Sequence, residues 1–135
     1  MDDTDRRLLA LLRLNARASF TSLAKELGTS EATVRARMKR LVDSGTIRRF
    51  TIRTAGNNVK ALIEVRITSH ADTGRIAGDV SAWDGVEAVW EVTGDNDLVV
   101  VADCPDANRL NSLIDRIRAV EGTESTRSRL VLREA

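Results

Sequence analysis

Basic side chains gather on one short stretch of this sequence, and their types and spacing suit contact with a polyanion. Val34, Met38 and Leu41 fall at i, i+4 and i+7, which predicts a helix with one narrow inward face. Small and polar residues occupy the middle of its outer face, with cations at the edges. Such a surface fits the major groove of duplex DNA, where a hydroxyl can bond a base edge and cations reach phosphates. The predicted DNA-binding residues are Ser30, Thr33, Arg35, Ala36, Arg37, Lys39, Arg40, Arg48 and Arg49.

A shorter helix precedes this one and meets it at a tight turn. Leu23, Ala24 and Leu27 form an apolar stripe at helical spacing, and Gly28 stands where a helix must stop and reverse. Ser30 is then placed to cap the following helix. This is the spacing of a helix-turn-helix, whose second helix reads DNA. An ordinary helical hairpin with solvated charges fits the spacing alone equally well.

The remainder of this half supports the two helices. Asp3 or Thr4 is expected to cap a first helix, and Phe20 to fill the core from the connector that follows it. After the second helix, Ile47, Phe50 and Ile52 form a β-like pattern with basic residues between them, which predicts a short strand or wing. Residues 1–54 are therefore predicted to form a helix-turn-helix DNA-binding domain with a short wing.

The charge of the chain changes sign near its middle. Residues 1–60 carry 13 Lys and Arg against 6 Asp and Glu, a net charge of +7, whereas residues 61–135 carry 8 against 14, a net charge of −6. Turn-forming residues cluster at 55–58, which predicts a linker there. A basic half joined to an acidic half indicates a polyanion partner, here double-stranded DNA, for the first half only.

Beyond this linker, residues 59–135 alternate between strand-like and helix-like patterns. Strands are expected over 59–67, 86–92, 98–104 and 124–133, with helices over 72–83 and from Pro105 onward. Val86, Ala88, Trp90 and Val92 should share one strand face, and the apolar run from Leu98 to Cys104 suits a strand buried on both faces. The order βαββαβ closes into a four-stranded antiparallel sheet with both helices on one side, a ferredoxin-like α+β domain.

The other side of that predicted sheet has no helix to cover it. Val99 and Val101 are expected on this face, and an apolar sheet face left open usually meets a partner of the same kind. The acidic half is therefore predicted to form a homodimer.

Enzyme chemistry finds little support in the residue types. His70 is the only histidine and has no evident acid or nucleophile beside it, while Cys104 suits a small buried hydrophobe. No Cys/His set suggests a metal, no glycine loop suggests a nucleotide, and no cofactor is expected. The N-terminus lacks a signal-peptide pattern, and no apolar run approaches the ~20 residues that cross a bilayer. A cytoplasmic protein without membrane partners is the expectation.

With both halves in place, the chain resembles the Lrp/AsnC family of prokaryotic transcriptional regulators. The similarity runs nearly end to end. Three segments carry it: the D-x-x-D-R-x-x-L-x-x-L-x-x-N-A-R start from Asp2 to Arg17, LAKELGTSEATVRARMKRLVDSGTI, and the turn Gly94-Asp95-Asn96-Asp97. The resemblance implies dimers that can assemble further into tetramers or octamers, and an amino acid or related small nitrogen metabolite bound between subunits.

The family places effector contacts near the 94–97 turn, where Asn96 here replaces a common tyrosine. Asp97 is a candidate for holding an ammonium group, and two hydroxyls on the last strand are candidates for a carboxylate. The predicted effector-binding residues are Gly94, Asp95, Asn96, Asp97, Thr126 and Ser128. A DNA-architectural protein of the same fold, with no ligand control, is the alternative that the Asn96 departure keeps open.

Overall fold

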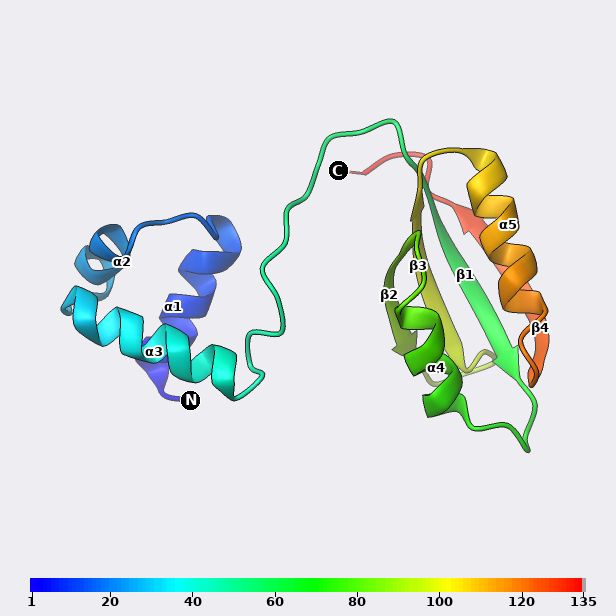
Figure 1. Ribbon diagram of the computed structural model, residues 1–135, viewed down its shortest axis with the longest axis horizontal. Coiled ribbons are helices and arrows are strands. Elements are labelled where there is room, and N and C mark those ends of the chain that lie inside the picture. Colours follow the sequence, from blue (N-terminus) through cyan, green and yellow to red (C-terminus); the bar gives the residue numbers. More distant parts are fainter. Residues whose placement is uncertain (135) are drawn as a thin grey trace. The chain divides into compact units, whose positions relative to one another are not determined.

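The computed structural model describes residues 1–134 and forms two compact units, one ending at Thr54 and the other beginning at Ala55 (Figure 1). The first unit contains three helices, α1 (Asp3–Leu14), α2 (Phe20–Leu27) and α3 (Glu31–Asp43). Their apolar stripes meet in one aliphatic core, which confirms the helix-turn-helix reading. Its buried members are Leu8, Leu12, Leu23, Ala24, Leu27, Val34 and Leu41.

The turn between α2 and α3 forms as its residue types predict. Gly28 ends α2 with φ of 68°, in the left-handed region that glycine enters without steric cost. Ser30 caps α3 by accepting the backbone N–H of Thr33.

Two expectations for the first unit were wrong. Asp2, rather than Asp3 or Thr4, caps α1, because Asp2 and Asp5 form a reciprocal capping box. Phe20 does not lie in a connector but opens α2, since Ser19 provides the cap. Its ring packs against the core and lies 4.3 Å from the Arg35 guanidinium carbon.

The predicted wing is also absent from the described residues. Residues 48–58 have no regular structure, and Phe50 and Ile52 are 55% and 79% exposed. A strand needs a hydrogen-bonding neighbour, and the first unit offers only helices among its described elements.

The second unit is the predicted βαββαβ domain. It consists of β1 (Val59–Ile67), α4 (Thr73–Ser81), β2 (Val86–Glu91), β3 (Leu98–Cys104), α5 (Ala107–Arg118) and β4 (Thr123–Leu130). The strands pair antiparallel in the order β2-β3-β1-β4. One sheet face packs against α4 and α5 in a core that includes Ile63, Val100 and Ile114. The α+β, ferredoxin-like fold class is confirmed.

Two details of the sheet differ from the alternation of the sequence. A β-bulge between Val86 and Ala88 shifts the register, so Val86 and Val89 pack toward the helices while Trp90 lies exposed on the other face. Apolar alternation cannot locate such an extra residue. On β3, every second residue from Leu98 is buried and those between are half-buried, so this strand is fully buried on one face rather than two.

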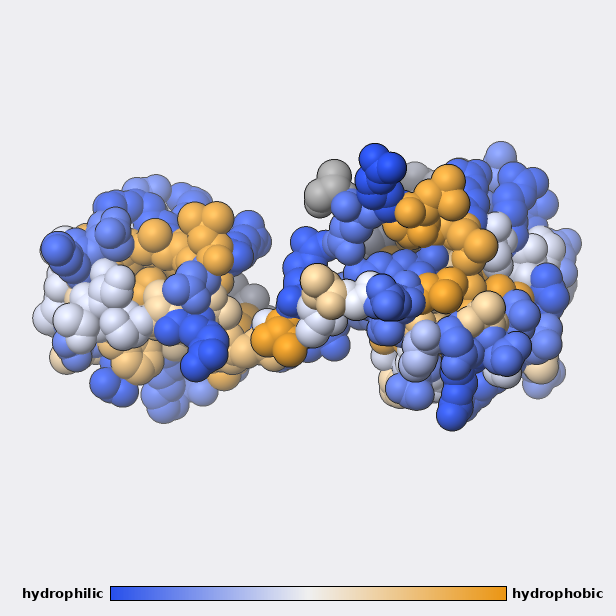
Figure 2. All heavy atoms as spheres, turned by 90° about the horizontal axis from the view of Figure 1, so that it is seen from above, coloured by the Kyte–Doolittle hydropathy of each residue, from blue (hydrophilic) through white to orange (hydrophobic). Residues whose placement is uncertain are grey.

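We call the face of the sheet away from α4 and α5 the open face. By strand register it carries Leu62, Glu64, Ala88, Trp90, Val99 and Val101. Apolar side chains reach the surface of the molecule among hydrophilic ones, as Figure 2 shows. Within residues 1–134, no helix has the length and apolar character needed to cross a bilayer.

Candidate functional sites

The first candidate site is the outer surface of α3. Ala36, Arg35, Lys39 and Arg40 are exposed along it, as are Arg48 and Arg49 beyond its end. Thr33 is half-buried near the start of the helix, and its hydroxyl lies 2.9 Å from the Ser30 hydroxyl. Every α3 member of the predicted DNA-binding set therefore reaches the surface at least in part, although the arginines differ in what they contact.

Two arginines of α3 converge on a carboxylate of α1. Arg37 donates from Nη1 to Asp2 Oδ2 at 2.7 Å and to Asp5 Oδ1 at 2.8 Å. Arg40 donates from Nη2 to both Asp5 oxygens at 3.0 Å. Asp5 is only 1% exposed, the one buried charged residue among those the structure describes. Sequence reasoning missed this acidic pair, whose only signal was two aspartates at capping spacing.

The arginines keep this buried carboxylate ionised. The hydrogen bond from Arg37, followed by the backbone N–H of Asp2, lowers the pKa of Asp5 from 3.8 to about 2. The same Arg37 hydrogen bond lowers the pKa of Asp2, and both aspartates raise the pKa of Arg37. Cations of α3 are thus fixed to α1 by charge-assisted hydrogen bonds.

The other cations of α3 have different partners. Lys39 pairs with Asp43 one turn further along the same helix. Arg35 stacks over Phe20 of α2. Neither contact involves α1, whereas Arg37 and Arg40 both form ion pairs with Asp5 of that helix.

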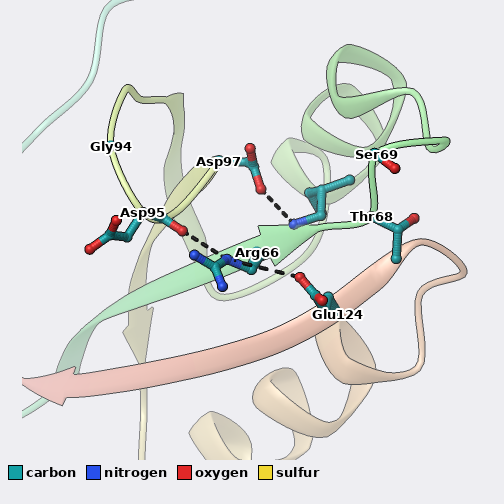
Figure 3. A pocket seen from close by; sticks show the side chains of 8 residues that line it. Arg66, Thr68, Ser69, Gly94, Asp95, Asp97 and Glu124 are labelled. Carbon is teal, nitrogen blue, oxygen red and sulfur yellow. Dashed lines mark hydrogen bonds and ion pairs between the residues drawn. The ribbon is translucent and has the colours of Figure 1, made fainter.

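The second candidate site is a hollow at one corner of the sheet, where the end of β1, the 94–97 turn and the start of β4 meet (Figure 3). Its volume is about 490 Å³, and we call it the corner hollow. Its lining residues are Arg66, Ile67, Thr68, Ser69, Gly94, Asp95, Asp97 and Glu124.

Both signs of charge line this hollow. Arg66 donates from Nε to the Asp95 carbonyl oxygen at 2.9 Å and lies 3.9 Å from a Glu124 oxygen, as Figure 3 shows. Asp97 accepts the backbone N–H of Ile67 through Oδ2 at 2.7 Å, and its own N–H donates to the Val65 carbonyl. These bonds fix the turn against β1, so the hollow is held by backbone as well as by side chains.

The predicted effector residues separate around this hollow. Gly94, Asp95 and Asp97 line it, whereas Asn96, Thr126 and Ser128 do not. Thr126 pairs with Val65 on the helix-covered side of the sheet, where its hydroxyl accepts from Arg118 Nε at 3.0 Å.

Arg66 and Glu124 are the lining charges that sequence reasoning missed. They are 58 positions apart in the numbering, and only the pairing of β1 with β4 brings them together.

A third feature is the open face of the sheet. Val99 and Val101 are half-buried there, and Trp90 is exposed. Glu64 lies at the centre of this face and pairs with Arg129 at 3.3 Å through Oε1, while its Oε2 is buried and has no hydrogen-bond partner. A buried oxygen without a donor is costly.

Cys104 and His70 do not lie in surroundings that would support catalysis. Cys104 is buried in the core of the second unit, and burial raises the pKa of its thiol, which disfavours the reactive thiolate. His70 is exposed. Residues 1–134 contain no group of three or more His, Cys, Asp or Glu placed to hold a metal.

Comparison with known proteins covers both units. Residues 1–42 match the AsnC-type helix-turn-helix domain, and residues 60–135 match the Lrp/AsnC ligand binding domain. The HTH-type transcriptional regulator LysM of Sulfurisphaera tokodaii is 40% identical over 134 residues, which cover 98% of this chain and 96% of that protein.

Solved structures resemble the whole chain as well. The leucine response regulatory protein of Mycobacterium tuberculosis superposes with a TM-score of 0.84 at 25% identity, covering 99% of this chain and 94% of that one. A Neisseria meningitidis transcriptional regulator, solved as a complex with L-Met, gives 0.79 at 26% identity, covering 99% and 91%.

Proposed function

The chain belongs to the Lrp/AsnC family of transcriptional regulators, and we propose that it binds duplex DNA sequence-specifically as a homodimer and responds to an amino acid or related small nitrogen metabolite. As a family member it has a DNA-binding helix-turn-helix, carries a ligand-binding domain and is not an enzyme. We assign DNA binding to the outer surface of α3, ligand binding to the corner hollow and dimerisation to the open face.

Support for the DNA surface comes from α3. Its outer side offers the exposed side chain of Ala36 and the half-buried Thr33, with cations beside them. Small residues let a helix approach base edges, while cations meet phosphates on either side of the groove. Arg48 and Arg49 extend the same basic surface beyond the helix.

The observation that carries the ligand proposal is the mixed charge of the corner hollow. An amino acid presents an ammonium and a carboxylate, so its site needs an acceptor for one and a donor for the other. Asp97 has one carboxylate oxygen committed to the Ile67 N–H, which leaves Oδ1 for an ammonium. The Arg66 guanidinium uses Nε for its hydrogen bond, which leaves its Nη groups for a carboxylate.

The homodimer proposal is supported by the open face. A second copy covering it would bury Val99 and Val101 and supply the donor that Glu64 Oε2 lacks. Light scattering at micromolar concentration should therefore give at least a dimer, and a folded monomer would contradict this part of the proposal.

A thermal-shift screen of the twenty amino acids tests the ligand proposal. A ligand that binds only the folded protein raises its melting temperature, by mass action. At least one amino acid should do so in the parent protein, and the response should shrink in the Asp97→Ala variant. If no amino acid raises the melting temperature of the parent protein, the DNA-architectural alternative is favoured. That alternative is motivated by Asn96, which replaces the tyrosine common in the family.

A further inference from the structure

Arg37 and Arg40 lie about one turn apart on α3, but their side chains differ in exposure and in the number of carboxylates they contact. Arg37 has a side chain 21% exposed and gives its Nη1 group to two carboxylates, those of Asp2 and Asp5. Arg40 is 62% exposed and contacts Asp5 through Nη2 alone. A guanidinium has five N–H donors in a plane, so Arg40 keeps its Nη1 and Nε donors for a further acceptor.

Asp5 is built to hold that guanidinium in place. Its Oδ1 accepts from both arginines, and its Oδ2 accepts from Arg40 and from the backbone N–H of Asp2. The carboxylate is itself buried on the first turn of α1, where the capping box fixes its backbone. Because Asp2 and Arg37 already hold this carboxylate, it is a rigid anchor for the long Arg40 side chain.

We propose that Asp5 is a positioning residue for DNA binding, which holds the Arg40 guanidinium through Nη2 so that Nη1 can donate to a backbone phosphate. Arg37 is the inner brace of the same cluster, tying α1 to α3 without contacting DNA. This inference rests on the proposed use of α3 as the DNA-binding surface. Holding Arg40 before DNA arrives removes part of the rotamer entropy that an unrestrained arginine loses on binding.

A double-mutant cycle separates positioning from simple charge. The affinities of the parent, Arg40→Ala, Asp5→Asn and the double variant are measured for a mixed-sequence DNA duplex by fluorescence anisotropy over a range of salt concentrations. Arg40→Ala should weaken parent binding by about tenfold and lower the log–log salt slope by about one per chain. In the Asp5→Asn background the same change should weaken binding less than about threefold, because Arg40 is no longer held.

Lys39→Ala is the matched control in both backgrounds. Lys39 lies beside Arg40 on α3 but pairs with Asp43, not Asp5. Its removal should weaken binding by the same factor whether or not Asp5 is present. Equal Arg40→Ala effects in both backgrounds would overturn the inference, as would a larger effect in the Asp5→Asn background, since Asp5 would then compete with DNA for Arg40.

A second variant keeps the test decisive where Asp5→Asn fails to fold. Arg40→Lys preserves the charge at an exposed position, but an ammonium lacks the planar fork that spans a carboxylate and a phosphate. Its affinity should fall nearly as far as that of Arg40→Ala, and parent-like affinity would overturn the inference. Failure of the parent to bind any duplex would instead overturn the proposed DNA surface.

Discussion

The two units of this protein use charge in opposite ways. In the first, a carboxylate is buried and closed in by arginines, so Asp5, Arg37 and Arg40 stabilise the fold and also shape its basic surface. In the second, Arg66, Asp97 and their neighbours stand around an open hollow and are partly held by backbone groups. The first unit therefore buries a carboxylate beneath its basic surface, whereas the second leaves charges of both signs around a hollow.

The largest effect should come from removing the inner arginine of the first unit. Arg37→Ala leaves Asp5 buried with one arginine fewer, and breaking a buried pair is strongly destabilising because a charge loses its partner. We expect the melting temperature of the first unit, followed by far-ultraviolet circular dichroism, to fall clearly. Trp83 and Trp90 both lie in the second unit, so tryptophan fluorescence serves as an internal reference that should not change.

Lys39→Ala is the comparison variant for that experiment. Lys39 forms an exposed ion pair within α3, and such pairs contribute little to stability. Similar melting temperatures for the Arg37→Ala and Lys39→Ala variants would show that the buried cluster is no more important than surface charge.

The next largest effect should be a loss of stability of the first unit in acid. The pKa of Asp5 is about 2 in the folded protein, below its ordinary value of 3.8, so its ionised form stabilises the fold above pH 3.8. This contribution is lost as the pH falls from about 4 toward 2, because the unfolded chain then takes up the proton more readily. Helical signal should weaken over this window, and Asp5→Asn should weaken that dependence. An unchanged acid profile in Asp5→Asn would contradict the assignment.

A smaller effect is expected at the corner hollow. Arg66→Ala removes the side chain that is proposed to donate hydrogen bonds to the carboxylate of the ligand, so it should reduce the ligand-induced thermal shift. Because Arg66 is exposed, the melting temperature of the free protein should change little. Arg109→Ala, on the exposed side of α5, removes the same charge away from the hollow and should preserve the shift. Equal responses in the two variants would move the ligand site elsewhere.

These two sites were not equally predictable from the sequence. The α3 surface lies on one continuous helix, so the spacing of Val34 and Leu41 fixes which residues point outward. The Asp5 cluster joins positions 32 to 35 residues apart, and no periodicity reports which carboxylate an arginine will reach.

The second unit shows the same limit for strands. Alternation predicted the βαββαβ order and the strand over 59–67, because period two is a local property. It could not locate the bulge before Ala88, nor predict that Arg66 and Glu124 would meet across paired strands. The resemblance directed attention to the 94–97 turn, but Thr126 and Ser128 lie outside the hollow that Gly94, Asp95 and Asp97 line.

The most direct test of the central claim couples the two units in one measurement. The affinity of the parent protein for a DNA duplex obtained by selection is compared with and without the amino acid that raises its melting temperature. A regulator must bind DNA differently in its two states, so the account predicts a change in affinity that Arg66→Ala abolishes. Identical DNA affinity in the presence and absence of a bound amino acid would contradict it.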